Sequence, residues 1–254
     1  MASTADNQFE PHTPTGDIRS ITKAPIALAL DAPDLATMSK WVQETAPFIS
    51  TMKIGLQTFY RDGESAVEVV SDSGCDFFLD LKLHDIPNTV AGAARSLARY
   101  KPTYVTVHAL GGSSMIEAAV SALPETRIAA VTILTSLDDS ELVNLGIETP
   151  AQDSVVRLAL IAVNAGARAI VCSPHEVGAV RKAVPPDIVL ITPGVRPQSS
   201  SADDQMRVSS PEDALKAGAN LLVIGRPITA AANVGLAAQR LSQEISGSGN
   251  ENDS

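Results

Sequence analysis

The sequence predicts an α/β protein that folds as a single (β/α)8 barrel of the TIM type. Short apolar runs rich in β-branched residues alternate with longer segments of helical period along most of the chain. This alternation is typical of a parallel sheet covered by helices. The apolar runs number about eight, which is the number of strands that a closed barrel needs. The length of 254 residues also suits one such barrel.

The expected strands are short, apolar and bounded by polar or turn-forming residues. They cover residues 26–30, 51–54, 77–81, 104–107, 128–134, 169–172, 188–192 and 221–224. An open doubly wound sheet would show a similar alternation. However, no GxGxxG motif follows the first run, where Leu30 leads into Asp31, Ala32 and Pro33. The closed barrel is therefore favoured.

Helices are expected between these runs, at residues 35–45, 89–98, 155–164 and 230–244. Two helix starts have a typical cap, because Ser173 and Ser210 are each followed by proline and, two positions later, by an acidic residue. Gly166 and Gly218 each precede an expected strand. Both are expected to adopt the left-handed conformation that ends a helix.

The barrel is expected to occupy residues 24–245 as one domain. Residues 1–23 and 246–254 are polar and rich in Ser, Thr, Asp, Gly or Asn. This composition is typical of disordered tails.

Composition limits the classes of partner. The formal net charge is -10 at pH 7, so nucleic acid is not an expected partner, because binding a polyanion needs a basic surface. No apolar run approaches the roughly 20 residues that span a bilayer, and residues 1–23 lack the basic and apolar regions of a secretory signal. We therefore expect a cytoplasmic protein that does not bind membranes. Cys75 and Cys172 have no metal-ligand spacing and are expected to be reduced core residues.

The end of the third expected strand carries the strongest signal for catalysis. Asp80, Lys82 and Asp85 follow an apolar run, and the carboxyl ends of barrel strands face the active site. Asp80 and Lys82 are two residues apart and are expected to project from the same strand face. An ion pair that only closes the strand is the alternative, but three charges crowded at a rim of low dielectric are costly unless they serve catalysis. The neighbouring carboxylates favour the charged form of Lys82, which then acts as a proton donor or an electrostatic stabiliser.

Other polar residues at strand ends carry weaker signals. Lys53 follows the second expected strand and Asp31 the first. Each either brings charge to the same rim or is a solvated loop residue. His108 ends the fourth strand, where a hydrogen-bonded histidine at the rim is as good an interpretation as a ligand contact. His84 alternates away from Lys82 and is not expected to be a ligand, and none of these residues has a spacing diagnostic of a metal site.

Two loops near the end of the chain indicate a phosphate site. Gly194 and Arg196 follow the seventh expected strand, and Gly225 and Arg226 follow the eighth and lead into a helix. In β/α barrels these two loops and a helix N-terminus frequently bind phosphate through backbone N–H groups. Gly225 allows a close backbone approach, and Arg226 can donate two hydrogen bonds to phosphate oxygens. The polar segment 198–205 is expected to close over a ligand as a lid.

Several segments match one enzyme family in order along the chain. They are residues 28–31, 52–55, 78–89, 106–109, 134–136, 192–197 and 223–227. The most specific part is the run DLKLHDIPNT at residues 80–89, whereas the Gly-Arg-Pro turn at 225–227 alone would identify nothing. On these residues the chain resembles the orotidine 5'-phosphate decarboxylase family.

The resemblance implies a homodimeric β/α barrel that needs neither a metal nor an organic cofactor. The implied reaction converts orotidine 5'-phosphate to UMP and carbon dioxide in de novo pyrimidine biosynthesis. Lys82 is implied to protonate C6, the pyrimidine carbon that loses carbon dioxide, and Asp80 to lie against the substrate carboxylate. Asp85 and Thr89 are implied to reach the neighbouring subunit's site, and Ile86 to contact the substrate.

The resemblance also implies how the rest of the substrate is held. Asp31 and Lys53 are implied to hold ribose hydroxyls, with Lys53 also in the charge network around Asp80. The residues implied to contact the base or the phosphate are Thr135, Ser136, Arg196, Gln205, Gly225 and Arg226.

Two other kinds of function remain open from the sequence. A magnesium-dependent sugar-phosphate decarboxylase or aldolase of the same superfamily shares the Asp-x-Lys-x-x-Asp pattern, although residues 86–89 argue against it, and a class I aldolase would form a Schiff base. A non-catalytic nucleotide-binding barrel is the alternative outside enzymes. Such a binding module has no need of the charges at Lys53, Asp80, Lys82 and Asp85.

Overall fold

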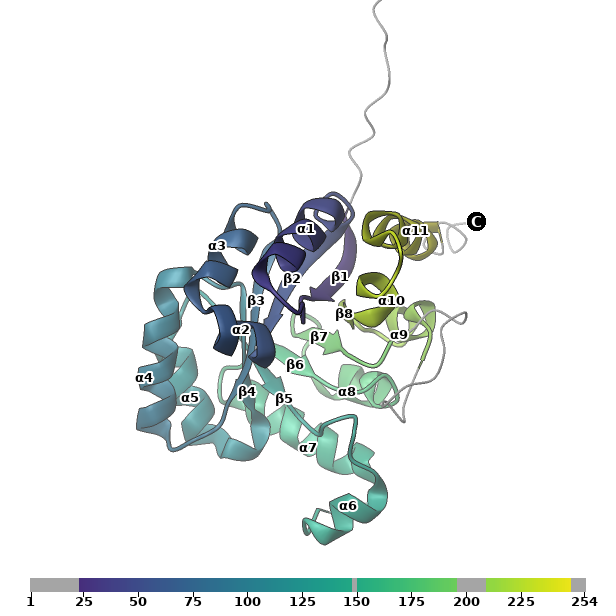
Figure 1. Cartoon of the computed structure of the whole chain (residues 1–254). Coiled ribbons are helices and arrows are strands. Elements are labelled where there is room, and N and C mark those ends of the chain that lie inside the picture. The colour runs from purple at the N-terminus through teal and green to yellow at the C-terminus, as the bar shows by residue number, and fades with distance from the viewer. Residues whose placement is uncertain (1–22, 148–149, 196–208, 248–254) are drawn as a thin grey trace, which may run out of the picture.

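The computed structural model describes residues 23–147, 150–195 and 209–247. Eight parallel strands pair in chain order and close into a barrel, with helices packed around its outside (Figure 1). This confirms the predicted (β/α)8 fold. The strands are β1 (Ala24–Ala29), β2 (Ile49–Gly55), β3 (Asp76–Leu83), β4 (Tyr104–His108), β5 (Arg127–Val131), β6 (Ala169–Val171), β7 (Val189–Thr192) and β8 (Leu221–Ile224).

Helices fill the connections between the strands. The first half of the chain contains α1 (Leu35–Thr45), α2 (Leu56–Asp62), α3 (Glu64–Ser71), α4 (Pro87–Leu97), the 3-10 turns η1 (Ala98–Tyr100) and η2 (Ala109–Gly111), and α5 (Gly112–Ala122). The second half contains α6 (Asp139–Asn144), α7 (Ala151–Asn164), α8 (Val177–Ala183), α9 (Pro211–Lys216), α10 (Arg226–Thr229) and α11 (Val234–Gly247). None of the helices in the described parts of the chain is long and apolar enough to cross a membrane.

The predicted helix ends agree with the structure only in part. Helix α1 has the predicted bounds, and Ser210 caps α9 by accepting a hydrogen bond of 3.1 Å from the backbone N–H of Asp213. The predicted helix at 230–244 is wrong at its start, because α10 ends at Thr229 and α11 begins only at Val234. Asn233 marks the true start, since its Oδ1 accepts a hydrogen bond of 2.8 Å from the N–H of Leu236.

The predicted cap at Ser173 is also wrong. Helix α8 begins at Val177, and Ser173 lies in a turn that precedes it. The Ser173 Oγ accepts a hydrogen bond from the N–H of His175 at 3.3 Å, and the Ser173 carbonyl accepts one from Glu176. The serine therefore closes a tight turn, which competes with helix initiation for the same side chain. Gly166 is left-handed as predicted, with φ at +91°.

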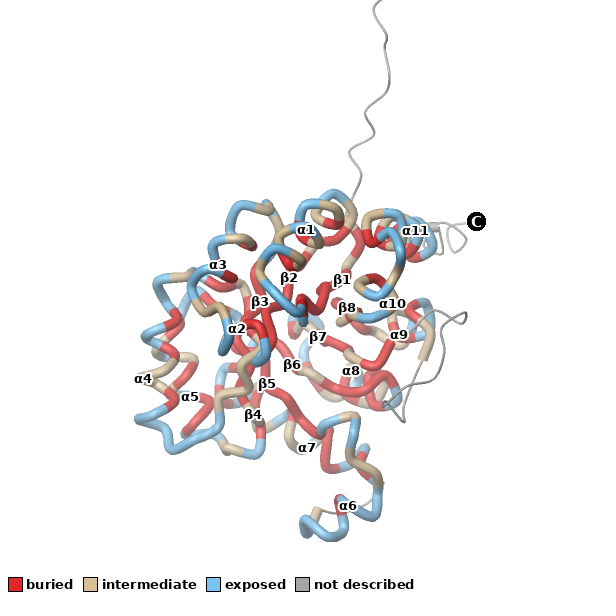
Figure 2. Tube along the Cα trace, in the orientation of Figure 1, coloured by how far each residue is buried: buried red, intermediate tan, exposed pale blue. Residues whose placement is uncertain are grey.

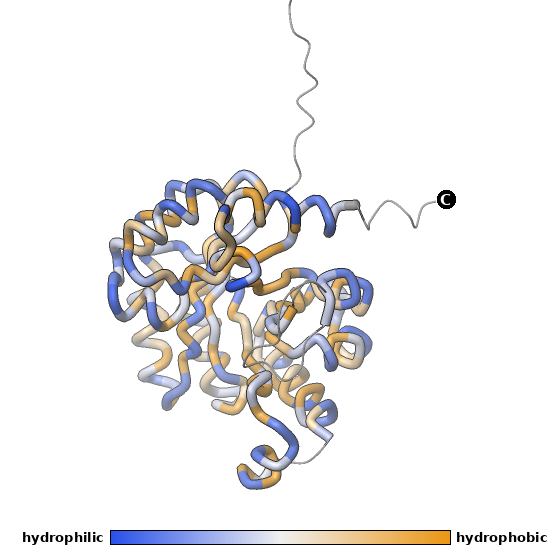
Figure 3. Tube along the Cα trace, turned by 45° about the vertical axis from the view of Figure 1, so that its right-hand side comes forward, coloured by the Kyte–Doolittle hydropathy of each residue, from blue (hydrophilic) through white to orange (hydrophobic). Residues whose placement is uncertain are grey.

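The core has two layers, as expected for a barrel whose strands are covered on both faces. Figure 2 shows the strands mainly buried, and Figure 3 shows them mainly hydrophobic against outer helices of mixed hydropathy. The larger layer lies between strands and helices, and the smaller one fills the barrel lumen. The buried residues of the lumen are Ala27, Phe78, Tyr104, Ala129, Ala169, Ile191 and Leu221.

The lumen layer positions the functional end of the barrel. Side chains of a strand alternate between its faces, so the residue two positions beyond each lumen residue also points into the barrel, nearer its carboxyl-terminal mouth. From Phe78 this step leads to Asp80, and from Tyr104 to Thr106. The rings of Phe78 and Tyr104 pack at a centroid distance of 5.5 Å directly beneath these two polar residues.

Candidate active site

Three charged side chains from two adjacent strands meet at the mouth of the barrel. Asp80 Oδ1 lies 2.8 Å from Lys82 Nζ, and Asp80 Oδ2 lies 3.1 Å from Lys53 Nζ. The side chains of Lys53 and Asp80 are only 7% and 16% exposed, whereas Lys82 is 29% exposed. Asp80 therefore binds one lysine on each carboxylate oxygen, and Lys82 is the member of the cluster that is most open to a ligand.

The lysines keep Asp80 ionised in spite of its burial. Burial alone would raise the pKa of Asp80, but the charges of Lys53 and Lys82 and the hydrogen bonds that both donate outweigh it. The pKa falls from 3.8 to about 2. A carboxylate with two ammonium neighbours stays charged at any physiological pH.

This ion-paired carboxylate predicts a pH dependence of stability that an Asp80→Asn variant should lose. Because the pKa of Asp80 is lower in the folded protein, its ionised form stabilises the fold above about pH 4, and this contribution disappears as the pH falls toward 2. A shift of this size corresponds to roughly 2 kcal/mol. Urea denaturation from pH 2 to 7 should show wild type and Asp80→Asn converging at the acid end. An Asp187→Asn variant in an exposed loop is the control, and a gap that is the same at every pH would contradict the prediction.

The backbone at Lys82 is not a regular strand. Its φ is +49°, in the left-handed region that non-glycine residues seldom adopt. The pairing of β3 with β4 also changes register here, since Leu79 pairs with Val105 but Leu83 pairs with Val107. The sequence predicted that Asp80 and Lys82 share a strand face by simple alternation. The two side chains do meet, but a bulge in β3 brings them together.

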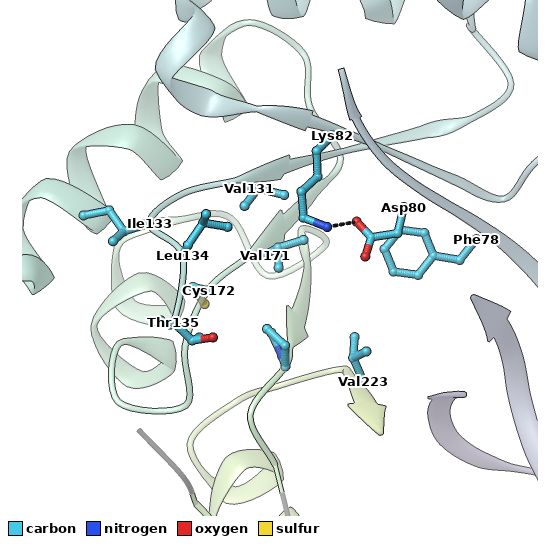
Figure 4. Close-up of a pocket in the computed structure, with 11 residues that line it drawn as sticks. Phe78, Asp80, Lys82, Val131, Ile133, Leu134, Thr135, Val171, Cys172 and Val223 are labelled. Atoms are coloured by element: carbon cyan, nitrogen blue, oxygen red, sulfur yellow. Dashed lines mark hydrogen bonds and ion pairs between the residues drawn. The ribbon is translucent and has the colours of Figure 1, made fainter. Parts of the chain in front are cut away.

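An apolar cavity opens beside this charge cluster (Figure 4). Figure 4 shows Asp80 and Lys82 joined at one side of the cavity and Thr135 on another. Most of the remaining lining is aliphatic or aromatic, and it consists of Phe78, Val131, Ile133, Leu134, Val171, Cys172, Pro193 and Val223. A flat, uncharged ring would fit such a surface, with its reactive atom facing the charges.

Cys172 takes no part in this chemistry as a thiolate. The side chain is buried, and burial raises the pKa of its thiol to about 12. A protonated thiol is a poor nucleophile. Cys172 is therefore a core residue, as predicted, and one edge of it completes the cavity wall. Both cysteines are free.

A second, more polar cavity adjoins the first. Asp31, Lys53, Gly225 and Arg226 line it, and Asp80 lines both cavities. The other residues that line both are Pro193 and Val223. One ligand can therefore extend from the apolar cavity past Asp80 to the arginine.

Glycine at position 55 leaves room for two of these charges. A Cβ atom there would lie 2.8 Å from Asp31 Oδ1 and 3.3 Å from Lys53 Nζ. The carboxylate of Asp31 and the ammonium of Lys53, which both line the second cavity, therefore both lie against Gly55. A larger residue would displace one of them.

Four predicted site residues are not brought to the cavities of their own chain. Asp85, Ile86, Thr89 and Ser136 are exposed, and none of them lines either cavity. Asp85 Oδ1 accepts a hydrogen bond of 2.6 Å from the N–H of Ile86, which precedes helix α4. Ile86 is a large apolar side chain that is 67% exposed. The predicted roles of these four residues stay predictions, as do those of the two that lie outside the described residues, Arg196 and Gln205.

The two histidines near the rim lie side by side. The rings of His84 and His108 have a centroid distance of 5.4 Å. The pKa of His108 is lowered by burial and by the neighbouring His84 and Lys82. Its buried Nδ1 has no hydrogen-bond partner among the described residues, and whether His108 contacts a ligand stays a prediction.

Sequence reasoning missed several residues that form the site. Thr106 is fully buried and its hydroxyl contacts both Asp80 and the backbone of Lys82. Val131, Val171 and Val223 form the apolar wall. The signal that would have found them is the strand alternation itself, because each lies two positions beyond a lumen residue.

The arrangement is that of a β/α-barrel enzyme. Charged side chains at the carboxyl ends of the strands, next to two joined cavities, are where such enzymes place their active sites. Within the described parts of the chain, no group of three or more His, Cys, Asp or Glu side chains is gathered as the ligands of a metal ion would be.

Comparison with known proteins gives the particular family. A family model described as "Orotidine 5'-phosphate decarboxylase / HUMPS family" matches residues 24–241. The orotidine 5'-phosphate decarboxylase of Thermobifida fusca (strain YX) is 58% identical over 227 residues, which cover 89% of this chain and 97% of that protein. The enzyme of the same name from Frankia casuarinae is 46% identical and covers 89% of each chain. The chain belongs to the orotidine 5'-phosphate decarboxylase / HUMPS family, and the predicted family is confirmed.

Solved structures agree with this family. The crystal structure of orotidine 5'-phosphate decarboxylase from Lactobacillus acidophilus is similar with a TM-score of 0.76 and 33% sequence identity. The similarity covers 88% of this chain and 99% of that one. An uncharacterized conserved protein from Geobacillus kaustophilus also has a TM-score of 0.76, at 32% identity.

Proposed function

We propose that this chain is an orotidine 5'-phosphate decarboxylase, which converts orotidine 5'-phosphate to UMP and carbon dioxide in de novo pyrimidine biosynthesis. The observation that carries the proposal is the position of Lys82, Asp80 and Lys53 at the junction of an apolar and a polar cavity. The names of the relatives support it independently. We further propose a cytoplasmic enzyme that needs neither a metal nor an organic cofactor.

The proposed reaction uses Lys82 as its acid. The bond between C6 and the carboxylate breaks, carbon dioxide leaves, and the electron pair stays on C6. The Lys82 ammonium then gives a proton to C6. Negative charge builds up on this carbon in the transition state, so a fixed ammonium beside it stabilises the transition state more than the bound substrate.

Asp80 has two roles in the proposed reaction. It holds Lys82 in place through their ion pair of 2.8 Å. It also faces the substrate carboxylate, and repulsion between the two anions raises the energy of the bound substrate. Binding at the remote phosphate offsets this cost.

The rest of the substrate is proposed to occupy the second cavity. Asp31 and Lys53, which lie against Gly55, hold the ribose hydroxyls. Gly225 and Arg226 hold the phosphate, together with Arg196 and Gln205. Thr135 contacts the base from the wall of the apolar cavity, with Ser136 beside it.

A homodimer with shared sites would explain the exposed polar segment after β3. Asp85 and Thr89 lie outside the cavities of their own chain and are exposed beside Ile86, an apolar residue typical of an interface. We propose that Asp85 and Thr89 reach the active site of a second copy. Each active site would then depend on both chains.

The test of the proposed function is the ultraviolet absorbance of orotidine 5'-phosphate with purified protein and EDTA. Loss of the orotate chromophore would establish a decarboxylase that works without a free divalent metal. Activity that requires added magnesium, or that appears only with a sugar phosphate, would favour the magnesium-dependent sugar-phosphate decarboxylase or aldolase of the same superfamily. Binding of the nucleotide without turnover would favour a non-catalytic barrel.

An Arg226→Ala variant is expected mainly to raise KM. A charge-assisted hydrogen bond to phosphate contributes both to ground-state and to transition-state binding, so its loss should raise KM by about 10- to 100-fold and leave kcat within a few fold. Initial rates over a range of substrate concentrations measure both constants. Arg240→Ala, on the exposed face of α11, is the matched control. An unchanged KM in Arg226→Ala would remove this residue from the phosphate site.

A further inference from the structure

Thr106 lies on β4 opposite the point where the register between β3 and β4 changes. It lies on β4 between Val105 and Val107, which are the two residues where the register of β3 changes. Three residues of β3, Asp80 to Lys82, lie between these two pairings, whereas on β4 only Thr106 lies between them. The extra residues of β3 therefore lose their regular backbone partners opposite Thr106.

The Thr106 side chain takes the place of a regular backbone partner at this bulge. The backbone N–H of Lys82 donates a hydrogen bond of 2.8 Å to Thr106 Oγ1. This N–H belongs to the residue with φ at +49°. A strained backbone persists only where surrounding contacts hold it, and the threonine hydroxyl provides such a contact.

The same hydroxyl also contacts the catalytic carboxylate. Thr106 Oγ1 lies 3.1 Å from Asp80 Oδ1, the oxygen that binds Lys82 Nζ. Because an ionised carboxylate only accepts hydrogen bonds, the hydroxyl must donate its one proton to Asp80. The acceptor side of the oxygen is then free for the Lys82 N–H. Thr106 is fully buried, so water cannot easily replace either bond.

We propose that Thr106 is a positioning residue for catalysis, which fixes the Asp80 carboxylate and the Lys82 backbone relative to each other through one hydroxyl group. This role rests on the proposed function of Lys82 as the acid, and it names the residue that directs the Lys82 ammonium. Lys82 has a long, flexible side chain, and its ammonium is directed only if both its backbone and its ion-pair partner are fixed. Small errors in the position of a reacting group have large effects on rate.

Thr106→Val tests the proposal, because valine keeps the shape of threonine and removes both hydrogen bonds. We expect kcat to fall by about 10- to 100-fold, as for the loss of a hydrogen bond to a charged group that acts in the transition state. KM for orotidine 5'-phosphate and the affinity for UMP should change by less than about threefold, since Thr106 lines neither cavity. Thr106→Ser retains the hydroxyl and should recover kcat to within a few fold of wild type.

A second readout follows proton transfer without decarboxylation. By reversibility, the base form of Lys82 removes the C6 hydrogen of UMP, so this hydrogen exchanges with deuterium in D2O and can be followed by proton NMR. Exchange should slow in Thr106→Val in parallel with kcat. A residue that served the fold alone would lower thermal stability without changing exchange at saturating UMP.

Thr126→Val is the matched control. Thr126 is also buried, and its hydroxyl donates to the carbonyl of Pro102 at 2.9 Å, before the start of β5. It should lose stability to a similar extent and keep kcat. If Thr106→Val does not fold, Thr106→Cys against Thr106→Ser makes the same comparison, because a thiol is a weak hydrogen-bonding group.

The outcomes are distinct. Wild type without decarboxylase activity would overturn the proposed function itself. An active wild type, together with a Thr106→Val or Thr106→Cys variant that keeps full kcat and full exchange, would overturn the role of Thr106 and leave the function intact. A fall in kcat that Thr106→Ser does not recover would also overturn it, since the hydroxyl would then not be the cause.

Discussion

Lys82→Ala is expected to lose more than about 10⁴-fold in kcat while it folds normally and still binds UMP. In the proposed mechanism the loss combines two effects that are each large, because the variant lacks both the proton donor and the charge that stabilises the developing carbanion. The fold should survive because Lys82 is the most exposed member of the cluster, and Asp80 keeps its ion pair with Lys53. Steady-state decarboxylation, circular dichroism and UMP titration measure the three properties.

Two further variants make the test of Lys82 specific. Lys182→Ala, at an exposed position of α8, controls for the loss of one positive charge and should keep wild-type kcat. Lys82→Arg keeps a positive charge but cannot give up a proton readily, so it should remain far below wild type. Turnover near the wild-type level in Lys82→Ala would exclude this lysine as the acid.

The barrel could be predicted from the sequence because each of its strands corresponds to a short apolar run. All eight expected runs overlap observed strands, and the pairing of β1 with β8 closes the barrel. The first residues of the helices were harder to predict. Ser173 and Ser210 carry the same local pattern, yet only Ser210 caps a helix. The difference is tertiary: Ser173 is buried two residues after the end of β6, and its hydroxyl closes a turn there.

The charged residues of the site could be predicted from the sequence. Lys53, Asp80 and Lys82 are exceptional at the ends of apolar runs, and the structure brings all three together. Thr106 carries no such signal, because a threonine in a strand is ordinary by composition. Its importance depends on a bulge in the neighbouring strand, and a register change between two strands is not encoded in either one alone.

The residues proposed to act across subunits are the other group that one chain alone cannot place. Asp85 and Thr89 are exposed in this chain, and neither lines a cavity of its own barrel. The proposed dimer supplies a reason, because each would reach the site of the partner. This proposal leads to a prediction with an effect as large as that of Lys82→Ala.

A mixture of Lys82→Ala and Asp85→Ala chains is expected to regain activity that neither variant has alone. In a mixed dimer, one site takes Lys82 from one chain and Asp85 from the other, so it is intact, while the second site lacks both groups. Random pairing of equal amounts makes half of the dimers mixed, and about a quarter of all sites should then be active. The measurement is decarboxylase activity after co-expression of the two variants.

The controls decide between a shared site and a simple failure of each variant. When a chain with both Lys82→Ala and Asp85→Ala is co-expressed with an equal amount of wild type, shared sites are intact only in dimers of two wild-type chains, about a quarter of all sites, whereas unshared sites would be intact in every wild-type chain, about half. Co-expressed Lys82→Ala and Asp80→Ala chains should regain nothing, since both residues serve the site of their own chain and every site then lacks one of them. If the Lys82→Ala and Asp85→Ala mixture stayed inactive although mixed dimers formed, Asp85 would belong to its own chain's site. Only shared active sites explain activity in the mixture of Lys82→Ala with Asp85→Ala together with no activity in the mixture of Lys82→Ala with Asp80→Ala.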